Sequence, residues 1–231
     1  MSVFERCLEK CRARKGVVVY SDGEDRRVVS AAAKLIREGL VEPILIGDPE
    51  KVRAALQESG ETGVSLQVVN PYNPALLQHN AAEYMAIQKG KGKDITEDEA
   101  VKAVKNPLAA GALMVRRGEA EIGVAGNLSS TADVIRAGLR MIGTAAGSKT
   151  VSSFFFMLKD NKVCMFTDCA VIPEPTSAQL ADIAISTAGV YKRVMDDEAR
   201  VALLSFSTKG SGKGGTVALS QKATEIAKEL A

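Results

Sequence analysis

Short apolar runs and helical patterns alternate along the first part of the chain. The apolar runs lie at residues 17–20, 43–46, 64–69 and 121–125. Each run is followed by a polar turn and then by a segment in which apolar residues recur at helical spacing. Strands that are separated by helices pair in parallel, because the return connection needs a helix. The first part of the chain is therefore predicted to be a parallel sheet covered by helices.

The pattern changes after residue 150. Residues 152–158 and 163–167 read as two strands, and the polar residues 159–162 between them have the length of a hairpin turn. This change places a domain boundary near residues 143–150. We predict an α/β protein with two α/β domains, residues 1–146 and 147–231, whose mainly parallel sheets are flanked by helices.

The second predicted domain continues with a helix, a strand and a last helix. Thr176 is the expected N-cap of the first helix, which extends to about residue 194. Residues 201–206 are predicted to form a buried strand that ends in a glycine-rich loop, and residues 217–230 form the last helix. We expect this loop, like the one after residues 121–125, to lie at the carboxyl edge of a parallel sheet, where ligands bind.

Composition narrows the classes of function. The chain is 46% hydrophobic and 25% charged, which argues against disorder, and its formal charge of +2 gives no general field for nucleic acid. No signal peptide and no run of about 18 apolar residues is present, so we expect a cytoplasmic protein without a membrane partner. The four cysteines are expected to be reduced, and His79 has no neighbours at metal-ligand spacing, so no metal site is predicted.

The loop after residues 121–125 is the first candidate site. Ser129, Ser130 and Thr131 offer hydroxyl donors, and Arg136 follows at a spacing that lets its guanidinium reach over the same crevice and bind phosphate or carboxylate. The alternative is an ordinary Ser or Thr helix cap followed by a surface arginine. The spacing alone leaves both open.

The glycine-rich loop is the second candidate. Hydroxyl, lysine and glycine residues occur together here, and backbone N–H groups in such loops bind anions; the residues are Ser207, Thr208, Lys209, Gly210 and Ser211. A flexible turn is the alternative. The loop also matches G-x-G-x-x-G at Gly210, Gly212 and Gly215, but no second strand follows to supply a ribose-binding carboxylate, and a phosphate-binding Walker A motif is excluded.

Three further groups of charged residues have open interpretations. Arg27 and the basic run at residues 89–93 add positive charge for a ligand with several phosphates, although the run also reads as solvated surface. Asp168 and Glu174 flank a loop as either helix caps or cleft acids.

Three ordered blocks together resemble the phosphate acetyltransferase family, most closely its ethanolamine-utilisation type. They are VAGNLSSTAD through RAGLRMIG at residues 124–143, FTDC through PEPT at residues 166–176, and LSFSTKGS with ATEIA at residues 204–227. The resemblance spans essentially the whole chain. It implies a two-domain enzyme of the isocitrate/isopropylmalate dehydrogenase-like architecture with a cleft between domains, usually a homodimer, with no metal or other cofactor.

The implied reaction is acetyl-CoA plus phosphate giving CoA plus acetyl phosphate, in which a CoA thiolate attacks the acetyl carbonyl directly. The resemblance implies that Arg136 and Arg27 bind CoA or phosphoryl groups and that residues 207–211 belong to the cleft. The family's catalytic serine, arginine and aspartate are expected beyond Ala231, so no catalytic residue is assigned and the chain by itself is expected to be nearly inactive. A butyryl or other short-acyl phosphotransferase and a non-catalytic CoA- or nucleotide-binding module are the alternatives.

Overall fold

The computed structural model describes residues 2–160, 162–208 and 210–230 of the 231-residue chain. The residues of the chain group in space into two compact units. One unit is Leu8–Gly143, and the other is Met1–Cys7 with Thr144–Ala231. The division into folding domains at residues 146 and 147 stays a prediction, because compactness does not test whether a segment folds alone.

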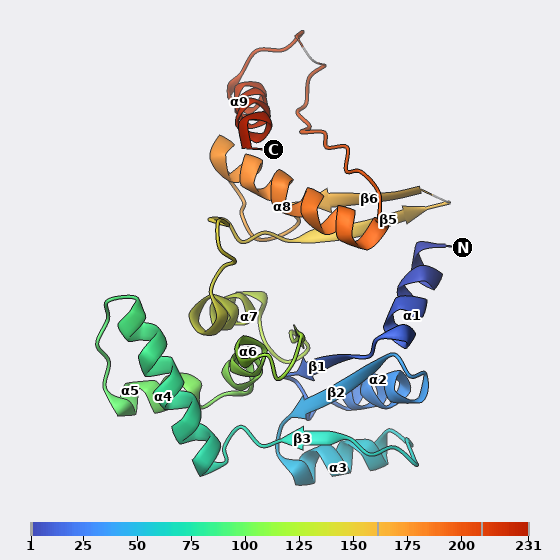
Figure 1. Ribbon diagram of the computed structural model, residues 1–231, viewed down its shortest axis with the longest axis vertical. Helices are drawn as coiled ribbons and strands as arrows, with labels where there is room; N and C mark the ends of the chain where they lie inside the picture. Colours follow the sequence, from blue (N-terminus) through green and yellow to red (C-terminus); the bar gives the residue numbers. More distant parts are fainter. Residues whose placement is uncertain (1, 161, 209, 231) are drawn as a thin grey trace. The chain divides into compact units, whose positions relative to one another are not determined.

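The first unit contains the predicted alternation of strands and helices (Figure 1). Helix α1 (Val3–Ala13) runs across the division at Cys7. The remaining elements of the unit are β1 (Gly16–Tyr20), α2 (Arg26–Arg37), β2 (Val41–Ile46), α3 (Pro49–Glu58), β3 (Gln67–Val69), α4 (Pro74–Gly90), α5 (Glu97–Val104), α6 (Pro107–Arg117), β4 (Ile122–Val124), α7 (Thr131–Ala137) and the π-helical turn η1 (Gly138–Ile142).

The helices of this unit begin at residues that cap them. Proline occupies the first turn of α3, α4 and α6, where its missing N–H would have had no partner within the helix, and the preceding residues Asp48, Asn73 and Asn106 accept backbone N–H groups. Thr96 and Glu99 form a capping box at the start of α5. These caps fix where each connecting loop ends.

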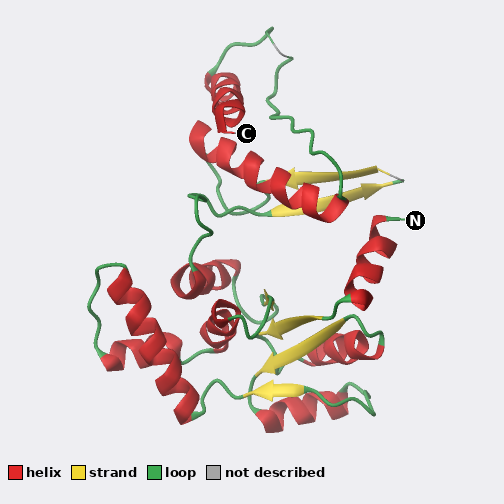
Figure 2. Ribbon diagram, viewed as in Figure 1, coloured by secondary structure: helices red, strands yellow, loops and turns green. Residues whose placement is uncertain are grey.

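The four strands of the first unit form one sheet in the order β3-β2-β1-β4, and every described pairing is parallel (Figure 2). Residue Val19 lies opposite Ile44 in β2 and opposite Gly123 in β4. The predicted parallel sheet flanked by helices is therefore confirmed. Because the strands are parallel, their carboxyl ends lie at the same edge of the sheet, and the loops that follow them converge there.

Both faces of the sheet are covered by helices. Leu45 packs with Val29 of α2 and Val52 of α3 on one face. Its neighbours in β2, Ile44 and Ile46, point to the other face and pack with residues of α6. Alternate residues of a strand point to opposite faces, so the unbroken apolar run of β2 is what a strand buried on both sides requires.

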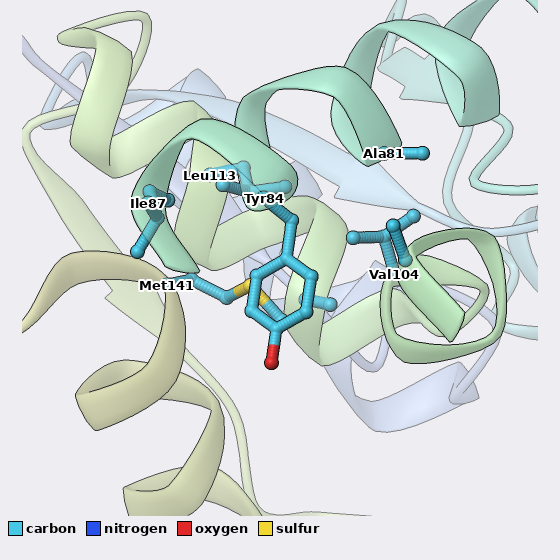
Figure 3. Packing of buried hydrophobic residues seen from close by; sticks show 8 residues of the cluster. Ala81, Tyr84, Ile87, Val104, Leu113 and Met141 are labelled. Carbon is cyan, nitrogen blue, oxygen red and sulfur yellow. The ribbon is translucent and has the colours of Figure 1, made fainter. Parts of the chain in front are cut away.

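A second apolar cluster joins α4, α5 and α6 to the π-helical turn (Figure 3). Tyr84 of α4, Leu113 of α6 and Met141 of η1 are all buried in it, and Figure 3 shows the sulfur of Met141 beside the Tyr84 ring. Burying a side chain of this size contributes about 1.5–3 kcal/mol. Met141 thus anchors the turn η1, which follows α7, to helices α4, α5 and α6.

The second unit contains a hairpin and two long helices. Strands β5 (Phe154–Lys159) and β6 (Lys162–Thr167) pair antiparallel, which confirms the predicted hairpin; Asn161 in its turn lies outside the described residues. Helix α8 (Ser177–Met195) begins at the predicted cap Thr176, and α9 (Gly215–Leu230) is the last helix. The described part of this unit therefore has no parallel strand pair.

The predicted strand at residues 201–206 is wrong. This segment has no strand assignment, and its side chains Val201, Leu204 and Phe206 are exposed by 55%, 85% and 78%. The apolar pattern favours a strand, but a strand also needs a partner that completes its backbone hydrogen bonds. In the described residues no such partner pairs with it. The loop at residues 207–215 consequently does not follow a strand.

Among the described helices, none combines the length and apolar character needed to cross a bilayer.

Candidate functional site

A cavity of about 510 Å³ opens at the carboxyl edge of the parallel sheet. Its walls come from the segments that follow the four strands and from the starts of α3 and α6. The end of α7 and the π-helical turn η1 complete them. This volume lies in the range of small-molecule sites. The cavity lies wholly within the unit of residues 8–143.

Asp22, which sequence reasoning missed, organises the cavity. It lies in the loop after β1 and is only 6% exposed. One of its carboxylate oxygens accepts the backbone N–H groups of Gly126 and Asn127, each at 2.8 Å. The loop after β1 therefore holds the loop after β4, where Ser129 and Ser130 lie. The sequence pattern could not predict the contact of Asp22 with Gly126 and Asn127, because these residues are far apart in the chain.

The hydroxyl residues of the first candidate loop have different roles. Ser130 is the N-cap of α7: its Oγ accepts the N–H of Asp133 at 3.2 Å and donates to the Asp133 carboxylate at 2.6 Å. Ser129 also lines the cavity and is half-buried, whereas Thr131 is the first helical residue and does not line it. The structure thus shows a helix cap and a cavity wall in the same loop.

Arg136 lines the cavity, as its predicted role requires. Its guanidinium contacts the Asp133 carboxylate at 3.1 Å and donates from Nε to the carbonyl of Ala132, also at 3.1 Å. Both side chains of the ion pair are more than half exposed, and such pairs contribute about 0–1 kcal/mol. Arg136 can therefore exchange Asp133 for a bound anion at small cost.

A second ion pair lies in another wall. Lys51 Nζ lies 3.1 Å from Glu24, and the other Glu24 oxygen accepts the N–H of Asp48 at 2.9 Å. The hydrogen bond to Glu24 raises the pKa of Lys51. Both residues line the cavity with Tyr72, and sequence reasoning singled out none of the three.

Arg27 does not line the cavity. It lies in the first turn of α2 and binds the N-cap residue Asp25, with Nη2 at 2.6 Å from one carboxylate oxygen. The hydrogen bond from Arg27 lowers the pKa of Asp25 to about 2. Its observed role is to support the start of α2, and its predicted ligand binding stays a prediction.

The second candidate loop belongs to the other unit. Ser211 donates from Oγ to the carbonyl of Thr208 at 2.9 Å, and Ser207 Oγ lies 3.4 Å from Ser211 Oγ. Gly210 has a φ of +85°, which a glycine adopts without strain. Lys209 lies outside the described residues. These hydrogen bonds join residues of the same loop to one another. The role of the loop in binding substrate stays a prediction.

Asp168 organises another loop of that unit. It accepts hydrogen bonds from the backbone N–H and the hydroxyl of Ser153 at 2.8 and 2.7 Å, and from the N–H groups of Val171 and Ile172 at 3.1 and 2.6 Å. Burial raises the pKa of the Asp168 carboxyl, but these hydrogen bonds together outweigh that effect and lower the pKa to about 2. Of the two sequence interpretations, the structure favours a structural acid.

The basic run at residues 89–93 and His79 do not line the cavity at the edge of the sheet. Gly90 and Lys91, from the basic run at residues 89–93, border a second cavity of about 460 Å³, where Glu83 and Arg116 also lie. His79 is exposed on α4. Within the described ranges, no group of three or more His, Cys, Asp or Glu side chains is placed to hold a metal ion.

Comparisons with known proteins agree on one family. The family model described as Phosphate acetyl/butaryl transferase matches residues 2–231. The phosphate acetyltransferase of Thermoanaerobacterium thermosaccharolyticum is 35% identical over 236 aligned positions, which cover 100% of this chain and 71% of the relative.

Two solved structures have the same fold. A phosphotransacetylase from Streptococcus pyogenes is 37% identical and superimposes with a TM-score of 0.89, covering 99% of this chain and 69% of the other. The EutD phosphotransacetylase from Staphylococcus aureus is 32% identical with a TM-score of 0.87, covering 99% of this chain and 68% of the other.

Proposed function

The chain belongs to the family described as Phosphate acetyl/butaryl transferase, and on that premise we propose that the cavity at the carboxyl edge of its sheet binds the phosphoryl group of a substrate. The activity is that of a phosphate acetyltransferase, an acyltransferase that exchanges an acetyl group between CoA and phosphate. Relatives from 32% to 37% identical carry this name.

The observation that carries the proposed site is the position of Arg136. Its guanidinium lies at the cavity wall, and its charged partner there is the half-exposed Asp133 carboxylate, which a bound anion can replace. Ser129 adds a hydroxyl at the same wall. A planar guanidinium binds two phosphate oxygens at once, so Arg136 suits a phosphoryl group better than a neutral ligand.

The chemistry of the transfer gives these residues a role. The CoA thiolate attacks the acetyl carbon of acetyl phosphate, the new C–S bond forms, the bond from carbon to the phosphate oxygen breaks, and phosphate leaves with the negative charge. The thiol proton passes to a base before the attack. A cation beside the phosphoryl group stabilises the charge that develops on the leaving oxygen. No described residue is assigned as the base.

The finer features of the enzyme are part of the same proposal. Acetyl rather than butyryl transfer is supported by the printed names of the relatives. An ethanolamine-utilisation type is supported by the likeness to the EutD phosphotransacetylase. A cytoplasmic homodimer is supported only by the sequence resemblance. A comparison of acetyl-CoA and butyryl-CoA turnover tests the acyl preference.

Arg136→Gln tests the proposed site. We expect the affinity for phosphate, measured by titration, to fall about 10- to 100-fold, the effect of losing one charge-assisted bidentate contact. Arg12→Gln is the matched control, because Arg12 is an exposed arginine of the same unit that does not line the cavity. Equal phosphate affinity in Arg136→Gln and wild type contradicts the proposed site. Tight binding of NAD without binding of CoA by the wild type favours a nucleotide-binding module instead.

A further inference from the structure

Arg140 lies on the same cavity wall as Arg136. Its side chain is exposed, and in the part of the chain that the structure describes it forms no ion pair and no hydrogen bond. The other basic side chains of the cavity, Lys51 and Arg136, are each paired with a carboxylate. The wall therefore contains one guanidinium whose charge is not offset by an acid of the described residues.

The acids of the cavity are already engaged. Asp22 accepts two backbone N–H groups, Glu24 pairs with Lys51, and Asp133 pairs with Arg136 and with the Ser130 hydroxyl. None of these acids contacts Arg140 among the described interactions. A ligand anion that enters this cavity therefore meets a guanidinium that has no protein partner to release.

The backbone that follows Arg140 is held in place by packing and by hydrogen bonds. Arg140 lies in the π-helical turn η1, and the next residue, Met141, is 2% exposed and packed into the apolar cluster of Figure 3. Arg116 donates to the carbonyls of Met141 and Ile142 at 3.3 and 3.2 Å. A buried neighbour and capped carbonyls hold the main chain while the guanidinium stays available.

The π-helical geometry and the charge pattern both point to a ligand. Single π-turns are rare in proteins and occur frequently at functional sites. Arg136 and Arg140 are four positions apart, and like charges at this separation on a helical segment repel each other. An anion that both guanidinium groups contact would remove this repulsion, since it supplies the opposite charge to each.

From this arrangement we infer that Arg140 is a substrate-binding residue that contacts a phosphoryl group in the cavity and acts together with Arg136. The inference rests on the proposed function, because the phosphoryl group is that of phosphate, of acetyl phosphate or of CoA. The geometry of a guanidinium fits all three equally. Arg140 is a binding residue and takes no part in the proton transfer.

Calorimetric titration of wild type, Arg140→Gln and Arg140→Lys with inorganic phosphate, CoA and dephospho-CoA tests the inference. We expect Arg140→Gln to bind at least one of these ligands about 10- to 100-fold more weakly, with Arg140→Lys in between, since lysine keeps the charge and loses the planar fork. A loss for phosphate identifies the transferred group as the contact. A loss for CoA but not dephospho-CoA identifies the ribose phosphate, and an equal loss for both identifies the diphosphate.

The controls separate a failure of the inference from a failure of the proposed function. Arg12→Gln should bind every ligand as the wild type does. Arg140→Gln should be at least as stable as the wild type to heat, because Arg140 forms no described ion pair or hydrogen bond and its charge repels that of Arg136. Wild-type affinity of both Arg140 variants for all three ligands overturns the inference alone. A wild-type protein that binds neither phosphate nor CoA overturns the proposed function and the inference with it.

Discussion

The carboxylate of Asp22 accepts the backbone N–H of Gly126 at 2.8 Å, and this bond joins the loops that follow β1 and β4. The two strands are neighbours in the sheet although most of the first unit separates them in the chain. Because the same oxygen also binds Asn127, Asp22 holds the chain that leads to Ser129 and Ser130. A buried acid that is remote in sequence thus positions the loop that is proposed to bind phosphate.

Asp22→Asn is expected to weaken both folding and substrate binding. An asparagine keeps one accepting oxygen but loses the charge that strengthens both bonds, so the free energy of unfolding should fall by about 1–3 kcal/mol. The displaced loop should also weaken the binding of phosphate. Denaturant unfolding and calorimetric titration with phosphate measure the two effects.

Glu42→Gln is the matched control for Asp22→Asn. Glu42 is an exposed acid of β2 and does not line the cavity, so this change removes a charge without touching the loop. Surface changes of this kind usually alter stability by less than about 0.5 kcal/mol. If Asp22→Asn matched Glu42→Gln in both stability and phosphate affinity, Asp22 would have no positioning role.

Ser129→Ala and Ser130→Ala should separate binding from capping. Ser130 caps α7, so its loss should lower the free energy of unfolding by about 1 kcal/mol. Ser129 lines the cavity and has no cap bond, so its replacement should leave stability unchanged and weaken phosphate binding. Thermal unfolding and phosphate titration of both variants check this, and equal stability losses would contradict the division of roles.

The parallel sheet and its helices could be predicted because their signals are local. The apolar runs at residues 17–20 and 43–46 and the cap at Thr176 each depend on a few neighbouring residues, and the structure contains the elements that they indicate. The strand predicted at residues 201–206 failed because pairing is a property of two segments. Its own pattern carries no information on whether a partner lies beside it.

The candidate site was predictable only in part. Ser129 and Arg136 stand in one short motif after a strand, and the cavity contains both. Asp22 and Lys51 come from other walls of the cavity and Arg140 from the wall that contains Arg136, and each has an ordinary surface or turn explanation in sequence. What distinguishes them is burial, pairing or the lack of a partner, and those properties appear only when distant loops meet.

Asp168 should make stability depend on acid pH. Its pKa is lowered from 3.8 to about 2 in the folded protein, so the folded state binds this proton less readily than the unfolded state does. The stabilisation is therefore present above about pH 4 and is lost as the pH falls toward about 2; because the carboxyl is partly exposed to solvent, we expect about 1–2 kcal/mol, less than the full shift implies. Denaturant midpoints measured at about pH 5 and about pH 2.5 give the difference.

Asp168→Asn should remove this part of the acid dependence. The amide does not titrate, so its curve should be flatter than that of the wild type between about pH 4 and about pH 2. The variant should also be less stable at neutral pH, because it loses charge-assisted bonds from Ser153, Val171 and Ile172. If the stability of Asp168→Asn fell between about pH 4 and about pH 2 as steeply as that of the wild type, other carboxyl groups would account for the acid dependence.

Gly23→Ala tests how closely the loop after β1 approaches the sheet. A Cβ at Gly23 would lie 2.7 Å from the carbonyl oxygen and 2.8 Å from the nitrogen of Ile46, both of which are backbone atoms of β2. Backbone atoms of a central strand do not rotate away, so the loop itself must shift. Overpacking of this kind costs about 1–3 kcal/mol. Asp22 and Glu24 flank the glycine, so the shift should also weaken phosphate binding.

Gly90→Ala provides the comparison that makes this prediction sharp. A Cβ at Gly90 meets no atom within 4 Å, and the residue ends helix α4, so alanine should be neutral or stabilise by up to about 1 kcal/mol. The same chemical change is thus expected to have opposite signs at two sites of one unit. Both variants add a methyl group and reduce the conformational entropy of the unfolded chain in the same way. The difference between their free energies of unfolding therefore reports how tightly Gly23 packs against Ile46. Equal effects would mean that the loop has room for a side chain, and that its position does not depend on glycine.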